Sequence, residues 1–73
     1  MPIIDFTLEE DYIALNQLLK LTDLCDSGGA GKQLVASGVV SVDGAVELRK
    51  TCKIRAGQRV EVQGQQILVH AAT

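Results

Sequence analysis

The segment from Ser27 to Gly44 constrains the fold most strongly, because its hydrophobic pattern changes from one period to another. Ser27 is a typical helix N-cap. Ala30, Leu34 and Val35 follow at helical spacing, and a glycine suited to the left-handed C′ position follows at 38. An alternating run then leads to an Asp-Gly pair at 43–44, which favours a type I′ turn. The segment therefore predicts a helix of about ten residues that leads into a β-hairpin.

The N-terminal part of the chain predicts an earlier, acidic helix. Residues 1–6 are expected to be extended and to lie against the core. Thr7 and Glu10 fit a capping box, and the pattern continues to about Lys20. The apolar residues that define its buried stripe are Leu8, Tyr12, Leu15, Leu18 and Leu19. Residues 21–26 are then a connector between two helices.

The C-terminal half predicts short strands separated by turns. The hairpin is expected over 39–42 and 45–49, a basic link over 50–55 and a turn over 56–58. Further strands are predicted over 60–62 and 67–69, with a turn at 64–65. The fold class is therefore α+β: two short N-terminal helices followed by a small, mostly antiparallel sheet of about four short strands. A chain of 73 residues fits a single domain spanning 1–73.

The net charge of −2 conceals an uneven distribution. Residues 1–19 contain four acids and no Lys or Arg, whereas residues 49–59 contain five cations and no acid. Charges farther apart than a Debye length of about 8 Å contribute little to each other, so the basic segment is expected to act as a local patch. A merely solvated basic loop is the alternative interpretation. The cations are Arg49, Lys50, Lys53, Arg55 and Arg59.

Two further features are suited to an anion. The helix start at Ser27, Gly28 and Gly29 offers free amides, and Lys32 lies in its first turn. An ordinary helix cap explains the same residues, and the spacing of a nucleotide-binding P-loop is absent. Lys20, at the end of the first predicted helix, complements the helix dipole without any ligand.

Catalysis, metals and cofactors find little support in the residues. Cys25, Cys52 and His70 lack the paired spacing of a zinc site, and no nucleophile stands beside a candidate base. Neither a secretory leader nor an apolar run of about 18 residues is present, so no membrane partner is expected. The sequence predicts a cytoplasmic, monomeric protein with reduced cysteines, no bound metal and no cofactor.

Five short motifs lie along the chain at residues 19–21, 27–32, 38–44, 47–50 and 56–62. Together they resemble the RNA-binding domain of the small-subunit ribosomal protein S-four family, and in particular its small stand-alone bacterial branch. The resemblance covers about residues 8–63. Gly28 stands where the larger family has Arg, and Asp43 where it has Asn.

The resemblance implies that the two helices pack in an L, the αL motif, and present a basic surface to folded RNA. We therefore expect a non-catalytic module that binds structured RNA, with ribosomal and transfer RNA as candidates, through phosphates and shape. Phe6 and Tyr12 are expected to be buried, so base stacking is not expected. The predicted RNA-binding residues are Lys32, Arg49, Lys50, Lys53 and Arg55, with Ser27, Gly28, Gly29 and Lys20. The alternative function is a protein-interaction module that uses the acidic first helix or an exposed sheet edge.

Overall fold

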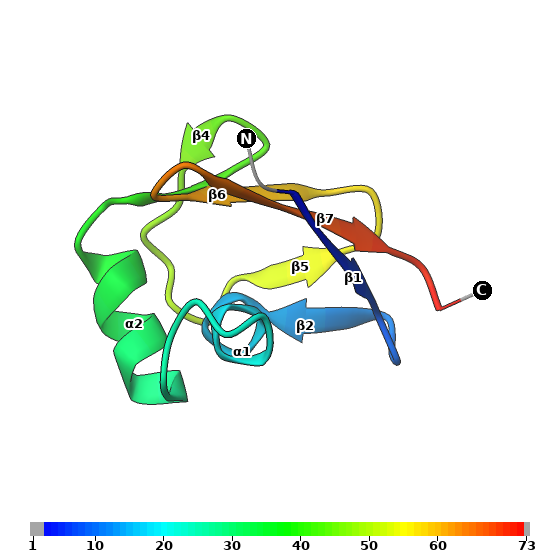
Figure 1. Ribbon diagram of the computed structural model, residues 1–73, viewed down its shortest axis with the longest axis horizontal. Coiled ribbons are helices and arrows are strands. Elements are labelled where there is room, and N and C mark those ends of the chain that lie inside the picture. Colours follow the sequence, from blue (N-terminus) through cyan, green and yellow to red (C-terminus); the bar gives the residue numbers. More distant parts are fainter. Residues whose placement is uncertain (1–2, 73) are drawn as a thin grey trace.

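The computed structural model describes residues 3–72, which form seven strands and two helices (Figure 1). The elements follow in the order β1 (Ile3–Thr7), β2 (Tyr12–Ala14), α1 (Leu15–Leu21), α2 (Gly28–Ala36), β3 (Val40–Val42), β4 (Ala45–Val46), β5 (Lys53–Arg55), β6 (Arg59–Val62) and β7 (Gln65–His70). The predicted α+β class with two helices is confirmed.

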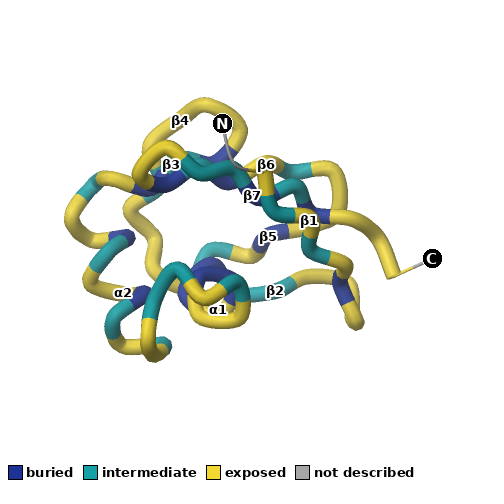
Figure 2. Tube along the Cα trace, viewed as in Figure 1, coloured by how far each residue is buried: buried dark blue, intermediate teal, exposed yellow. Residues whose placement is uncertain are grey.

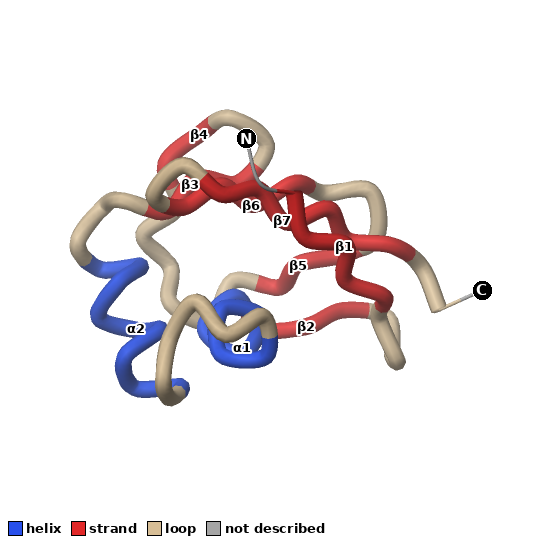
Figure 3. The backbone as a smooth tube through the Cα atoms, viewed as in Figure 1, coloured by secondary structure: helices blue, strands red, loops and turns tan. Residues whose placement is uncertain are grey.

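The strands form two sheets, drawn in red in Figure 3. Five strands make a mixed sheet in the order β1-β7-β6-β3-β4, in which only β1 and β7 run parallel. The other two strands, β2 and β5, form an antiparallel ribbon. Figure 1 shows this ribbon and both helices on one side of the larger sheet.

The hydrophobic core fills the space between these two layers (Figure 2). Leu15, Leu18 and Leu19 of α1 are fully buried there, because they recur on one face of the helix. Across from them, alternating residues of β3, β6 and β7 point inward, as the period of a half-buried strand requires. The remaining fully buried side chains include Val35 of α2 and Ile54 of β5.

The two helices cross closely at Gly31. Figure 1 looks along α1, whereas α2 lies across the line of sight. A Cβ atom on Gly31 would lie 2.8 Å from the backbone oxygen of Asn16, so only glycine fits without movement of α1. The Asn16 side chain is buried beside this contact, and its Oδ1 has no hydrogen-bond partner among residues 3–72.

The predictions for the central segment are confirmed. The Ser27 Oγ accepts a hydrogen bond of 3.1 Å from the Ala30 N–H, and α2 ends before Gly38, whose φ is +84°. Asp43 and Gly44 both have positive φ, as a type I′ turn requires. The return strand is shorter than expected, however, since β4 covers only Ala45–Val46.

The first half of the helix predicted over 7–20 is wrong. Thr7 ends β1, so no capping box forms, and the chain is helical only from Leu15. The residues between them bend sharply and then form β2, which pairs with β5. Tyr12 consequently lies on a strand and is 42% exposed, whereas burial on a helix was predicted. A strand partner so distant in sequence leaves no trace in a local pattern, and for that reason the helical spacing was misleading.

The predicted order of elements and the strand count are also wrong. Two strands precede the helices, and the structure has seven strands rather than about four. The extended N-terminal segment is paired with β7, and the basic link contains β5. The last turn lies at Gln63 and Gly64, one residue earlier than predicted.

Candidate functional site

A hollow of about 780 Å³ lies between α2 and the segment that joins β4 to β5. We call it the basic pocket, because four of its seven lining residues are cations. Sequence analysis predicted all four as RNA-binding residues, and the fold brings them together from two segments of the chain. The lining residues are Lys32, Leu48, Arg49, Lys50, Thr51, Cys52 and Lys53.

Backbone hydrogen bonds hold the segment 47–52 in place. The N–H groups of Leu15 and Asn16 donate to the carbonyl oxygens of Cys52 and Lys50, at 2.9 and 3.1 Å. The start of α1 has no side-chain cap, so these carbonyls satisfy amides that the helix itself leaves unpaired. The Glu47 backbone N–H donates to the Val40 carbonyl oxygen of β3 at 3.0 Å. The segment is therefore fixed to α1 and to β3.

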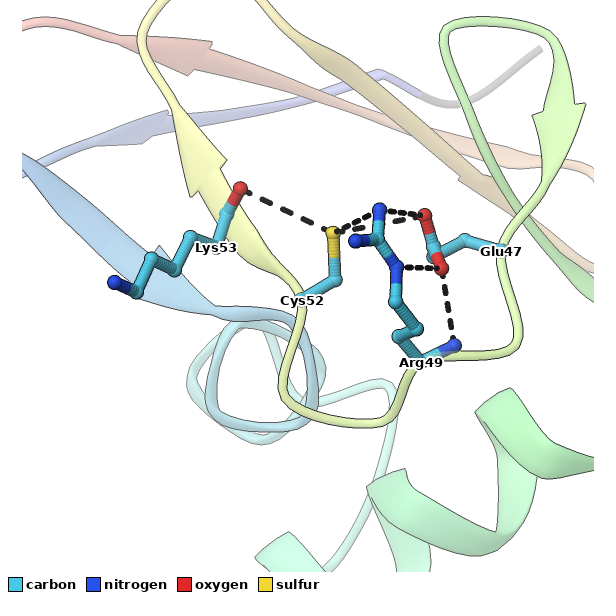
Figure 4. A network of polar contacts seen from close by, with 4 residues as sticks. All are labelled: Glu47, Arg49, Cys52 and Lys53. Atoms are coloured by element: carbon cyan, nitrogen blue, oxygen red, sulfur yellow. Dashed lines mark hydrogen bonds and ion pairs between the residues drawn. The ribbon is translucent and has the colours of Figure 1, made fainter.

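A carboxylate holds Arg49 within this segment (Figure 4). Glu47 Oε2 accepts hydrogen bonds from the Arg49 Nε, at 2.9 Å, and from the Arg49 backbone N–H, at 3.0 Å. Glu47 Oε1 accepts a bond of 3.1 Å from Arg49 Nη2 and a weak one of 3.6 Å from the Cys52 thiol. The bonds from Arg49 lower the pKa of Glu47 to about 2. Burial and the neighbouring carboxylate raise the pKa of Cys52.

Tyr12 joins the basic pocket to Arg55. Lys53 Nζ lies 5.0 Å and Arg55 Cζ 5.6 Å from the centre of the Tyr12 ring, both within the range of cation–π attraction. The contact arises because Tyr12 lies directly opposite Arg55 in the β2–β5 ribbon. Lys53 lines the pocket and also touches this ring, so Arg55 extends the cationic surface along the ribbon.

The other predicted residues lie away from the basic pocket. Ser27, Gly28 and Gly29 form the start of α2, and Lys20 is exposed in the last turn of α1. None of these four residues lines the pocket. Arg59 lies on β6, where it pairs with Glu61 at 3.5 Å.

Most cations of the chain are free to meet an anion. Within residues 3–72, Arg49 and Arg59 are in ion pairs with Glu47 and Glu61. The others form no ion pair in that part of the chain, and three of them line the basic pocket. These unpaired cations are Lys20, Lys32, Lys50, Lys53 and Arg55.

A second hollow, of about 480 Å³, has the opposite charge. We call it the acidic hollow, because Glu9 and Glu10 are its only charged lining residues. Tyr12 and Leu21 are half-exposed apolar residues in its wall. These acids were predicted on a helix, but they lie in the bend between β1 and β2. The remaining lining residues are Phe6, Thr7, Leu8 and Ile13.

Sequence analysis missed two residues of this region. Glu47 lies just outside the basic segment, and the return strand was expected to continue through it. A Glu-x-Arg spacing at the end of a hairpin was the available signal, since side chains two residues apart on a strand share a face. Tyr12 was assigned to the core, and only its pairing with β5 reveals its exposed position.

The described residues contain neither a membrane-spanning helix nor a metal-binding cluster. Within 3–72, neither helix is long and apolar enough to cross a membrane. Over the same range, no group of three His, Cys, Asp or Glu side chains is arranged to hold a metal ion. Cys25 and Cys52 are both free thiols.

The S4 domain family matches residues 6–70 of the chain. YbcJ of Escherichia coli (strain K12), by name a candidate RNA-binding protein, is 48% identical over 60 residues, which cover 82% of this chain and 86% of YbcJ. RlbA of Bacillus subtilis (strain 168), by name a candidate ribosome maturation protein, is 33% identical over 58 residues, which cover 80% of this chain and 82% of RlbA. The solution structure of E. coli YbcJ, described as having an αL motif involved in RNA binding, superimposes with a TM-score of 0.74 at 43% identity and covers 97% of this chain and 91% of YbcJ.

Proposed function

We propose that this chain, which belongs to the S4 domain family, is a non-catalytic module that binds structured RNA through phosphates and shape. One observation carries the proposal: cations from α2 and from the segment 47–53 converge on the basic pocket. Because RNA carries a charge on every phosphate, such a cluster gains affinity by releasing counterions. The αL motif described for YbcJ supports the same function for α1 and α2 here.

The proposed RNA-binding residues divide into those that line the basic pocket and those that lie around it. Lys32, Lys50 and Lys53 are unpaired and line the pocket, so they are the primary phosphate contacts. Arg55 extends the contact past Tyr12. At the start of α2, the N–H groups of Gly28 and Gly29 have no partner within the helix and are suited to one further phosphate. Lys20 contributes only to the general field.

The name of the Bacillus relative favours ribosomal RNA over transfer RNA as the target. The surface is suited to a folded RNA rather than to a single strand. Among the Phe, Tyr and Trp side chains of residues 3–72, Tyr12 is the one that is half-exposed, and cations already lie against its ring. A stacking platform for successive bases needs several such rings. We further propose that the protein acts as a cytoplasmic monomer, in keeping with its two free thiols.

The test is recovery of RNA cross-linked to the protein in cells, followed by sequencing. In the test variant, Arg49, Lys50, Lys53 and Arg55 are replaced by Gln. In the matched control, Glu9 and Glu10 are replaced by Gln and Asp11 by Asn. We expect recovery to fall at least tenfold for the test variant and to stay level or rise for the control. Equal recovery from wild type and test variant would contradict the proposal.

Salt dependence provides a second measurement. If four or five cations neutralise phosphates, the logarithm of the affinity should fall against the logarithm of the salt concentration with a slope of about −3 to −4. Each lysine removed from the pocket should make that slope shallower by about 1. A slope near zero would show that phosphates are not the main contacts.

The acidic hollow favours a second candidate function. Its apolar wall and its two carboxylates are complementary to a basic protein segment with an apolar side chain. Within residues 3–72 neither carboxylate is in an ion pair. A complex between this chain and another protein that survives nuclease treatment, but is lost in the Leu21→Asp variant, would support this candidate. Loss of that complex with the nuclease would leave RNA as the partner.

A further inference from the structure

Arg49 is oriented by its pairing with Glu47. A guanidinium has five N–H donors, and the contacts with Glu47 use the one on Nε and one of the two on Nη2. Both donors of Nη1 remain, while Nη2 also donates weakly to the Cys52 Sγ at 3.8 Å. One N–H of Nη1 and one N–H of Nη2 lie parallel at the end of the guanidinium, the geometry that contacts two oxygens of a phosphate at once. Arg49 lines the basic pocket, and its side chain is 77% exposed.

Glu47 is itself held firmly enough to orient another side chain. Its side chain is only 16% exposed, and four donors meet its two oxygens: Arg49 Nε, Nη2 and backbone N, and the Cys52 thiol. Its own backbone N–H is bonded to β3 through the Val40 carbonyl. The carboxylate is therefore fixed to the same framework that holds the pocket.

We propose that Glu47 is a positioning residue, which holds the Arg49 guanidinium for a two-pronged contact with one RNA phosphate. The inference rests on the proposed function and deepens it, because it separates Arg49 from the lysines of the pocket. A lysine is a mobile point charge, whereas an arginine held at one edge has lost its rotamer freedom before the RNA arrives. The conformational entropy of the Arg49 side chain is then already lost in the free protein, so RNA binding does not have to remove it.

The sign of the Glu47→Gln effect makes the proposal testable. If Glu47 were only a negative charge beside a basic site, its removal would strengthen RNA binding by reducing repulsion. If it positions Arg49, its removal weakens binding although the protein becomes more positive. Glu61→Gln is the matched control, because it removes a carboxylate from the other Arg–Glu pair, which lies outside the pocket.

The probe is purified bacterial ribosomal RNA in a filter-binding titration at fixed salt. We expect Glu47→Gln and Arg49→Lys each to weaken binding about tenfold, and the double variant to be no more than about tenfold weaker than wild type, because the two changes disrupt one contact. Glu61→Gln should bind as tightly as wild type or tighter. In the free protein, hydrogen exchange at the Arg49 Nε–H should be faster in Glu47→Gln than in wild type.

The outcomes separate this inference from the proposed function. Wild type that binds no ribosomal RNA under these conditions would overturn both. Wild type that binds, with Glu47→Gln as tight as Glu61→Gln, would overturn only the positioning role. Arg49→Lys retains Glu47 and the charge, so it tests the two-pronged contact even if Glu47→Gln fails to fold. Binding by Arg49→Lys equal to wild type would overturn that contact.

Discussion

The segment 47–52 and the bend 9–11 are both irregular, exposed and strongly charged, but they are held very differently. Backbone hydrogen bonds link the first to α1 and β3, and a partly buried carboxylate fixes one of its cations. The second contains Glu9, Glu10 and Asp11, and within residues 3–72 none of their side chains forms a hydrogen bond or an ion pair. Charge alone therefore does not distinguish a binding loop from a solvated one.

The difference lies in what each segment would lose on binding. A segment that is already ordered gives up little conformational freedom when a ligand arrives, so more of its contact energy appears as affinity. A segment without internal bonds must be ordered at that moment. The basic pocket is thus better prepared for a ligand than the acidic hollow, and substitution of the residues that hold it should reveal how far this order depends on each of them.

The largest expected effect is that of Gly31→Ala. The new Cβ would lie 2.8 Å from the Asn16 backbone oxygen, so α1 must move away from α2. We expect a loss of about 1–3 kcal/mol in the free energy of unfolding, measured with denaturant. Because the Asn16 N–H holds the Lys50 carbonyl, amide exchange should also become faster in segment 47–52. No bond of this kind connects Asn16 to the bend 9–11, so exchange there should not change.

Gly29→Ala is the matched control for that change. A Cβ on Gly29 meets only the Ser27 Oγ at 3.8 Å, an ordinary contact. Alanine is the better helix former, so this variant should be as stable as wild type or gain up to about 1 kcal/mol. If Gly31→Ala and Gly29→Ala have the same free energy of unfolding and the same amide exchange, the close crossing of α1 and α2 does not hold segment 47–52 in place.

The elements around the basic pocket, which are held by hydrogen bonds, were also the elements that the sequence could predict. Ser27, Gly38 and the Asp-Gly pair at 43–44 each specify a backbone conformation through their own chemistry, so α2 and the hairpin follow from local rules. The cations of the pocket were found because they cluster in sequence. Their meeting with Lys32 follows from the order of those same elements.

The N-terminal region around the acidic hollow could not be predicted in the same way. Residues 8–19 carry apolar residues at helical spacing, yet Tyr12–Ala14 is a strand because β5 pairs with it. β1 likewise depends on β7, at the far end of the chain. Such pairings are decided by tertiary contacts, which outweigh the local pattern of a short segment. The Glu47–Arg49 pair was missed for a related reason, since the return strand ends earlier than its alternation suggests.

Ser27→Ala tests the second helix with a smaller expected effect. The Ser27 Oγ accepts the Ala30 N–H at 3.1 Å, and without it one amide at the start of α2 loses its partner. We expect a loss of about 1 kcal/mol in the free energy of unfolding. Ser37→Ala serves as the comparison at the other end of α2. There the Ser37 hydroxyl donates to the Leu34 carbonyl oxygen, which the Ser37 backbone N–H also reaches, so the carbonyl keeps a donor when the hydroxyl is removed. An equal loss in both variants would mean that the Ser27 cap is no more important to α2 than the hydroxyl at its C-terminal end.

The smallest expected effect is the pH dependence of the Glu47–Arg49 pair. The folded protein lowers the pKa of Glu47 from 4.5 to about 2, so the ionised form stabilises the fold above pH 4.5. That contribution is lost as the pH falls through 4.5 toward 2, because the carboxyl group is then protonated in both states. The difference in Tm between wild type and Glu47→Gln should therefore be largest near neutral pH and shrink steadily below pH 4.5. Since Arg49 is largely exposed, the difference should be small and should decrease with added salt. A difference that stays constant down to pH 2 would show that Glu47 supports the segment through packing alone, and the contrast with the bend 9–11 would then rest on backbone hydrogen bonds rather than on the ion pair.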